Sequence, residues 1–172
     1  MNSNYIYTKV NELIDKYKTN NPFELIEYLK IKLMSSNNEE LKGYCISVKN
    51  YPYIGVSCLL SDPEQRIVAA HELGHYILHM DQTSLYRFED DNIYNSSDKT
   101  EYQANLFAAD LLILDEDVED IVKDESIDYF SLCSMLSVTT ELMSFKLFSM
   151  KKRGFNYKTP ITPKSDFLKN YN

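Results

Sequence analysis

The stretch HELGHYILH, residues 71–79, holds all three histidines of the 172-residue chain. His71 and His75 stand four residues apart, so in an α-helix they lie about 40° apart around the axis and one turn along it. Two imidazoles placed in this way can bind one metal ion, and Glu72 at the flank of the same face can reach a water molecule there. The alternative is a packing helix with chance histidines, which would leave two buried imidazoles in need of polar partners. The pattern favours a metal site in which Glu72 is the general base.

A catalytic zinc ion takes a third protein ligand and keeps one position open for water. His79 cannot be that ligand, because eight helical residues place it about 12 Å from His71, whereas Zn–N bonds are about 2 Å long. We expect His79 at the end of the helix or at the rim of the site. The third ligand should therefore be a carboxylate or a cysteine from elsewhere. The downstream carboxylates that could serve are Asp81, Glu89, Asp90, Asp91, Asp98, Glu101 and Asp110.

Glu101 differs from the other candidates because it begins a strongly helical stretch, EYQANLFAADLL. Asn105 follows four residues later and shares a helical face with Glu101, while the alanines, leucines and Phe107 of the stretch supply apolar packing. Spacing therefore favours Glu101 as a metal ligand and Asn105 as a polar group that supports the site. Most of the other carboxylates are expected in loops or at a helix start, where they face solvent.

Apolar periodicity predicts helices on both sides of a small β-rich region. Asn21 with Pro22, and Ser61 with Glu64, are signatures of helix N-termini. Residues 81–97 are polar and predict a loop. The expected helices cover residues 4–18, a segment from Asn21, a segment from Ser61 to about 80, 98–113, 115–124, and two helices within 128–153 around a turn at Ser137–Thr139, ended by Gly154.

Three segments favour strands: residues 31–36, 41–50 and 51–61. The last two flank a turn near Asn50–Pro52, which predicts a β-hairpin with Cys45 and Cys58 as cross-strand neighbours. An extended substrate peptide could add to an edge strand, which we expect from residues 53–60. The three cysteines, Cys45, Cys58 and Cys133, form no CxxC pair and are expected as reduced thiols.

The net charge of −8 and the pI of about 4.9 argue against nucleic-acid binding through overall charge. The acidic stretches at 88–92 and 114–126 are interpreted as solvated surface. No apolar run approaches the roughly 18 residues of a membrane span, and the N-terminus has no apolar signal-peptide region. We therefore expect a soluble, cytoplasmic protein without membrane attachment.

The motif pair resembles the ImmA/IrrE family of zinc metallopeptidases. AAHELGHYILH (69–79) and EYQANLFAADLL (101–112) match the family pattern AHELGH followed, after a variable loop, by E-x-x-A-[ND]-x-F-A-x-x-L-L, and the resemblance covers about residues 20–150. It implies an α+β, mostly helical zincin-like fold of the gluzincin type, with a small β-sheet of about three strands. It also implies Zn²⁺ held by His71, His75 and Glu101, with Glu72 as general base. The chain lacks the proline that often follows the LL pair in the family, which affects helix termination more than chemistry.

We divide the chain into a peptidase domain at 1–125, a helix-turn-helix-like helical segment at 126–154 packed on it, and an irregular tail at 155–172. Nothing basic lines the helical segment, which favours packing or protein binding over DNA contact. The resemblance implies an endopeptidase that cleaves a helix-turn-helix (Xre/cI-like) repressor and so relieves repression of prophage, mobile-element or stress genes.

The alternative is a non-proteolytic metal-binding regulator or toxin–antitoxin component that acts by protein binding. A metal hydrolase with a non-peptide substrate is a third and weaker interpretation. Glu72 favours proteolysis, because pure binding needs no general base. A further group should stabilise the oxyanion. The candidates for it are Tyr51, Tyr53, Tyr76 and His79.

Overall fold

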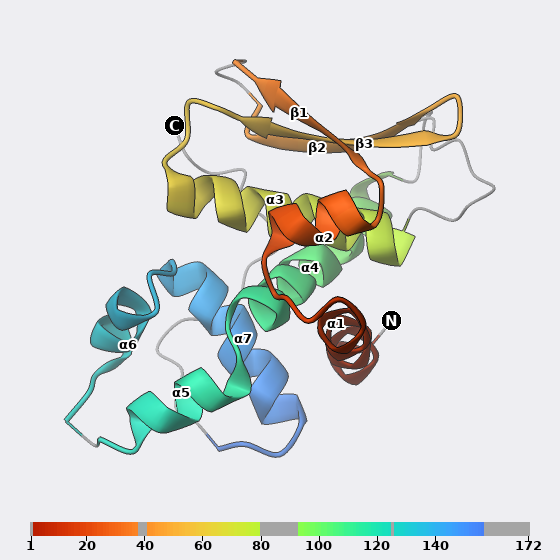
Figure 1. The fold of residues 1–172 in the computed structure, drawn as a ribbon. Coiled ribbons are helices and arrows are strands. Elements are labelled where there is room, and N and C mark those ends of the chain that lie inside the picture. The colour runs from red at the N-terminus through yellow and green to blue at the C-terminus, as the bar shows by residue number, and fades with distance from the viewer. Residues whose placement is uncertain (1, 38–40, 80–92, 125, 157–172) are drawn as a thin grey trace.

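Three strands form a mixed sheet that lies along one side of a group of helices (Figure 1). This computed structural model describes residues 2–37, 41–79, 93–124 and 126–156, with the backbone alone at 93–98. The helices are α1 (Ser3–Tyr17), α2 (Pro22–Tyr28), α3 (Asp62–His79), α4 (Ile93–Leu112), α5 (Asp115–Val122), α6 (Tyr129–Met135) and α7 (Thr140–Lys152), and the strands are β1 (Lys32–Ser36), β2 (Gly43–Val48) and β3 (Tyr51–Ser57). The α+β, mostly helical class predicted from the sequence is confirmed.

The sheet has the order β1-β3-β2, with β1 parallel and β2 antiparallel to β3. The prediction that residues 53–60 form an edge strand is therefore wrong, because β1 pairs along the second side of β3. The two edge strands among the described residues are β1 and β2.

The turn of the β2–β3 hairpin lies at Lys49–Asn50, where both residues have left-handed backbone angles, φ 51° and φ 66°. A two-residue turn of this kind matches the natural twist of paired strands. It places Cys45 opposite Ile54, whereas Cys58 lies beyond the end of β3, so the predicted Cys45–Cys58 pairing is wrong. Proline has no backbone N–H to donate to a neighbouring strand. Pro52 is tolerated in β3 because the pairing with β1 begins only at Tyr53, the next residue.

Local capping explains where several helices begin. The Asn21 side chain accepts a hydrogen bond from the Phe23 amide, and the Glu64 carboxylate accepts from the Ser61 amide and hydroxyl, as the sequence predicts. The Thr139 hydroxyl accepts from the Leu142 amide at the start of α7. The other helix predictions hold except that α4 begins at Ile93 rather than 98. Polarity is a weak reason to predict a loop at 93–97, because asparagine and serine cost only about 0.7 kcal/mol or less each within a helix. Residues 81–92 of the predicted loop lie outside the described residues.

Helices α3 and α4 pack against each other through the centre of the molecule (Figure 1). A Cβ atom added at Gly74 of α3 would lie 3.1 Å from Phe107 Cβ and 3.2 Å from Ala104 Cα of α4. Glycine therefore allows the two helix backbones to approach closely where the candidate ligands must converge. Helix α7 packs against α4 and α1, and its Phe145 belongs to the same hydrophobic core as Phe107. The division between 125 and 126 stays a prediction.

Candidate metal centre

His71 and His75 lie on the side of α3 that faces α4, as the four-residue spacing predicts. Their Nε2 atoms are 3.0 Å apart. His71 is buried and His75 is half-buried, so the pair is only partly accessible to solvent. Two ring nitrogens this close either share a proton or direct their lone pairs at one cation.

Glu101 of α4 completes a triangle with the two histidines. Its Oε2 atom lies 3.4 Å from His71 Nε2, and its Oε1 atom lies 3.3 Å from His75 Nε2. Burial alone would raise the pKa of Glu101, but hydrogen bonds from His71 and His75, and their charge, hold it well below its usual range. The carboxylate is therefore ionised whenever the protein is folded near neutral pH.

The triangle has the dimensions of a metal site. One donor atom from each of His71, His75 and Glu101 can be chosen so that all lie within 4.8 Å of one another. Donors on a tetrahedral ion with bonds of about 2 Å stand about 3.3 Å apart, close to the three separations given above. These residues therefore fit a divalent metal ion bound by two nitrogens and one oxygen.

Glu72 follows His71 on α3 and is only 8% exposed. A Cβ atom at Gly43 of β2 would stand 3.0 Å from Glu72 Oε1 and would overlap Val68, so only glycine lets β2 lie this close to α3. Burial is the main cause that raises the pKa of Glu72 to about 7; the charge of His75 opposes the rise and that of Glu101 adds to it.

His79 and Asn105 flank the triangle without belonging to it. The Nε2 atom of His79 lies 3.3 Å from the Thr100 carbonyl oxygen, and its ring centroid is 5.6 Å from that of His75. This is the helix-end position expected for His79. Asn105 is fully buried on α4, one turn after Glu101.

The other carboxylates considered as third ligand do not join the triangle. Asp110 is buried on α4, but its oxygens bind Lys146 Nζ at 3.1 Å and Ser149 Oγ at 2.7 Å, so it belongs to a separate buried cluster. The remaining candidates, Asp81, Glu89, Asp90, Asp91 and the side chain of Asp98, lie outside the described residues.

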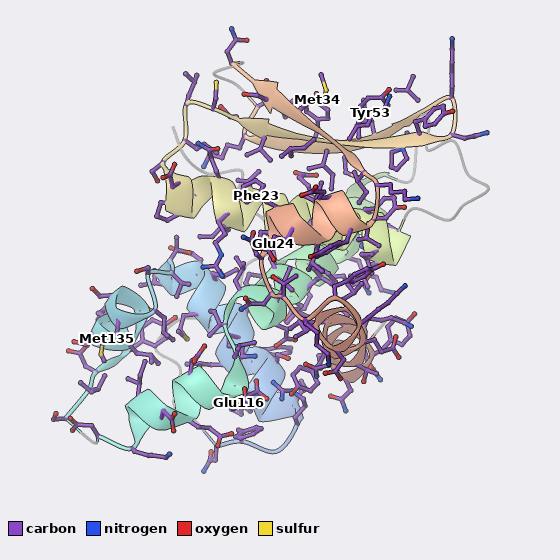
Figure 2. The ribbon with its side chains drawn as sticks, viewed as in Figure 1. Phe23, Glu24, Met34, Tyr53, Glu116 and Met135 are labelled. Carbon is purple, nitrogen blue, oxygen red and sulfur yellow. The ribbon has the colours of Figure 1, made fainter. Side chains whose placement is uncertain are left out.

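Two of the candidate oxyanion groups are misplaced for that role. The sheet register puts Tyr51 and Tyr53 on the face opposite Ile54, which packs toward the helices. Figure 2 shows Tyr53 projecting from the side of the sheet that faces away from the helices. Tyr76 follows His75 on α3. Burial is the larger cause that raises the pKa of Tyr76, and the charges of nearby Cys45 and Tyr17 add to the rise. Tyr76 and His79 remain near the site.

Sequence reasoning missed the contribution of β2. Gly43 packs on Glu72, and Cys45 on the same strand lies near it, where burial first and the charge of Glu72 second raise the pKa of the thiol to about 12. Gly43 was the available sign in the sequence that a close contact is made here. That its contact is Glu72 depends on the sheet register, which no local pattern encodes.

The chain matches a known family along most of its length. A family model described as the IrrE N-terminal-like domain matches residues 26–148, a span that includes the sheet, α3, Glu101 and most of α7. The chain belongs to this family and is a metallopeptidase of the ImmA/IrrE type. The resemblance inferred from the two motifs is thus confirmed.

Two relatives come from Bacillus and one of its phages. The protein named Uncharacterized immunity region protein 2, from Bacillus phage phi105, is 38% identical over 111 residues, which cover 64% of this chain and 69% of the relative. Metallopeptidase ImmA of Bacillus subtilis (strain 168) is 28% identical over 140 residues, which cover 75% of this chain and 79% of the relative. In the part of the chain that the structure describes, no helix has the length and apolarity needed to cross a membrane.

Proposed function

We propose that this metallopeptidase is a zinc-dependent endopeptidase that cleaves a helix-turn-helix transcriptional repressor in the cytoplasm. Cleavage would relieve repression of prophage, mobile-element or stress genes. The observation that carries the proposal is the triangle of His71, His75 and Glu101 with the buried carboxylate of Glu72 beside it. A site used only for binding has no need of that carboxylate.

The donor set supports zinc as the metal. Two imidazole nitrogens and one carboxylate oxygen, with a fourth position open, are the ligands that catalytic zinc takes in hydrolases. When bound, such an ion supplies Lewis acidity, which makes water more acidic and polarises a carbonyl group.

Glu72 is the group that moves the proton. Its carboxylate oxygen accepts a proton from the attacking water and later gives it to the nitrogen of the leaving amine. A pKa near neutrality suits both steps, because the group can take up and release a proton at the pH of the cytoplasm. Its burial between α3 and Gly43 holds the carboxylate in one place for this transfer.

The edge of β2 that pairs with no other described strand is the best place for an extended substrate. β2 pairs only with β3 among the described residues, and Gly43 at its start touches Glu72. A peptide that adds to this edge forms main-chain hydrogen bonds and runs past the triangle. The opposite edge is formed by β1, and β3 lies between it and β2, the strand that touches Glu72.

The repressor as substrate is supported by the names of the relatives. One is an immunity region protein of a phage, and the other is named Metallopeptidase ImmA. The resemblance of the two motifs to the ImmA/IrrE family implies a repressor of this kind as the substrate. The helical segment at 126–154 would then contact proteins rather than DNA. The alternative is a metal-binding regulator, or a toxin–antitoxin component, that inhibits its partner without cutting it.

Co-expression with the helix-turn-helix protein encoded beside the gene separates the two functions. We expect the wild-type protein to cut this partner and Glu72→Gln to leave it intact. Mass spectrometry of the fragments identifies the bond. Cutting that survives Glu72→Gln would reject the assigned role of Glu72. Inhibition of the intact repressor by both forms, at equal stoichiometry, would favour the binding alternative.

A further inference from the structure

The sheet has one face that the described helices do not cover. Ile54 and Val56 of β3 are buried against the helices, so the residues next to them along the strand, and the register partners of those residues, point the other way. In Figure 2, Met34 and Tyr53 project from this other side, away from α2 and α3. We call this surface the outer face. Its apolar and aromatic side chains are Met34, Tyr44, Ile46, Val48, Tyr51 and Tyr53.

The outer face is apolar and open to solvent. Ile46 is 43% exposed, Val48 46% and Tyr51 61%. The ring of Tyr44 lies across Gly55, where a larger residue would have to displace it, so the aromatic surface extends from β2 over the central strand. A contiguous exposed apolar surface on a protein of this size marks a site of interaction.

Two lysines lie on this surface or at its end, although the protein as a whole is acidic. Lys32 pairs with Tyr53 in register and Lys49 forms the hairpin turn, whereas the chain as a whole carries a net charge of −8. Lys32 Nζ lies 5.3 Å from the Tyr51 ring centre and 5.2 Å from that of Tyr53. Lys49 is exposed at the hairpin turn. Lys32 and Lys49 therefore border the aromatic surface and would attract negative charge.

The outer face is continuous with the edge of β2 that pairs with no other described strand. Side chains alternate between the two faces of a sheet, so a peptide added to β2 places every second side chain beside Ile46 and Val48. The intervening side chains lie on the face of Gly43 and Cys45, which is the face of Glu72. One bound strand would thus present one set of side chains to the catalytic side and the other set to the outer face.

We propose that the outer face selects the protein substrate, and that it prefers a segment with apolar side chains at alternate positions flanked by carboxylates. The proposal rests on the endopeptidase function given above, because it names the substrate of that same site. Ile46 and Val48 contact the alternate apolar side chains. Lys49 and Lys32 attract the flanking carboxylates, and the rest of the acidic protein repels carboxylates that approach elsewhere.

Binding of fluorescent peptides to the zinc-loaded Glu72→Gln protein tests this preference without any need for hydrolysis. The peptides share one alternating apolar centre and differ only in their flanks, which are glutamate, glutamine or lysine. We expect the glutamate-flanked peptide to bind about tenfold more tightly than the lysine-flanked peptide at low salt, and the difference to shrink as salt is added.

Charge reversal identifies the surface. Introducing Lys32→Glu with Lys49→Glu should invert the order of the peptides, whereas the matched control, Lys151→Glu with Lys152→Glu at the exposed end of α7, should keep it. Threonine favours β-strands as isoleucine and valine do, so Ile46→Thr with Val48→Thr should keep β2 intact. It should weaken the binding of all three peptides by the same factor. Circular dichroism confirms that each variant is folded.

Equal binding of the three peptides, or an order unchanged by reversal of Lys32 and Lys49, would overturn the proposal. If the repressor is cleaved but the peptides show no flank preference in binding, the role of the outer face is rejected and the endopeptidase function stands. If the peptides show the flank preference but the repressor is not cleaved, the role of the outer face stands and the endopeptidase function is rejected. If sedimentation shows a dimer that Ile46→Thr with Val48→Thr dissociates, the outer face is covered by a second copy and the substrate assignment is wrong.

Discussion

The Nε2 atom of His79, the last residue of α3, lies 3.3 Å from the carbonyl oxygen of Thr100, the residue directly before Glu101. Burial, and next the charge of His75, lower the pKa of His79 to about 4, so the ring is neutral at physiological pH. A neutral ring that meets a carbonyl with Nε2 carries its proton there and donates it. This bond connects the helix of the two histidines to the start of the Glu101 region.

We therefore expect His79→Ala to weaken zinc binding by about 10- to 100-fold, the usual cost of losing a group that orients a metal ligand. His79→Gln, which can still donate to the carbonyl, should restore most of the affinity. Competition with a chromogenic chelator measures both, and circular dichroism controls for folding. Wild-type affinity in His79→Ala would show that the bond has no part in placing Glu101.

Removal of Glu101 should abolish stabilisation by zinc. A ligand that binds only the folded state raises the melting temperature, and the rise disappears when binding is lost. We expect Glu101→Ala to purify without zinc and to melt at the same temperature with or without it. Glu116→Ala, at an exposed glutamate of α5 labelled in Figure 2, is the matched control and should respond to zinc like the wild type. Unchanged zinc content in Glu101→Ala would remove this residue from the ligand set.

Burial of Glu72 should make the metal-free protein less stable as the pH rises. Its pKa is raised from 4.5 to about 7, so between these values the folded state keeps a proton that the unfolded chain has released. Stability contributed by the protonated form is present below pH 4.5, falls through this window and is lost above pH 7. Glu72→Gln has no such proton to lose.

The variant should therefore gain stability relative to the wild type between pH 4.5 and pH 8, by up to about 3 kcal/mol. Urea denaturation in the presence of a chelator measures the difference at each pH. Only the change of this stability difference with pH is diagnostic, because replacing glutamate by glutamine also adds a contribution that does not depend on pH. A difference that does not vary with pH would mean that Glu72 is more solvated than its position against Gly43 indicates.

The parts of the site that follow from local sequence were predictable. His71, His75 and Glu72 are placed by one helix, and Glu101 by the apolar pattern of the next. The sheet was not predictable in the same way, because the parallel pairing of β1 with β3 joins strands that are not adjacent in sequence. The hairpin register depends on left-handed angles at Lys49 and Asn50, and neither residue is a glycine. Because of that register, Tyr51 and Tyr53 lie on the face of the sheet that points away from the metal centre.

Asp110 illustrates a second limit of sequence reasoning. It stands in the same helical stretch as Glu101, and its type alone made it a possible ligand. Its partners, Lys146 and Ser149, are 36 and 39 residues away along the chain. Burial and long-range pairing, which decide its role, leave no trace in the local pattern.

The same cluster gives a prediction for stability. Lys146 is fully buried, and its Nζ atom lies 3.1 Å from Asp110 Oδ1 and 2.6 Å from Asp115 Oδ1. Arg153 also pairs with Asp115, and Tyr7 donates to it, so the cluster joins α1, α4, α5 and α7. Lys146→Met should destabilise the protein by about 3–5 kcal/mol, because it leaves buried carboxylates short of positive charge.

Lys123→Met is the matched control for that substitution. Lys123 Nζ also lies 2.6 Å from a carboxylate, Asp120 Oδ1, but both side chains are 73% exposed. Water and salt screen that pair, so its loss should have no measurable effect. Urea denaturation of both variants, with Lys146→Met combined with Asp110→Leu as a third, measures the difference. The double variant should recover part of the loss, since it removes an unpaired buried charge. Equal effects of the two lysine substitutions would show that burial does not set the energy of the Asp110 cluster.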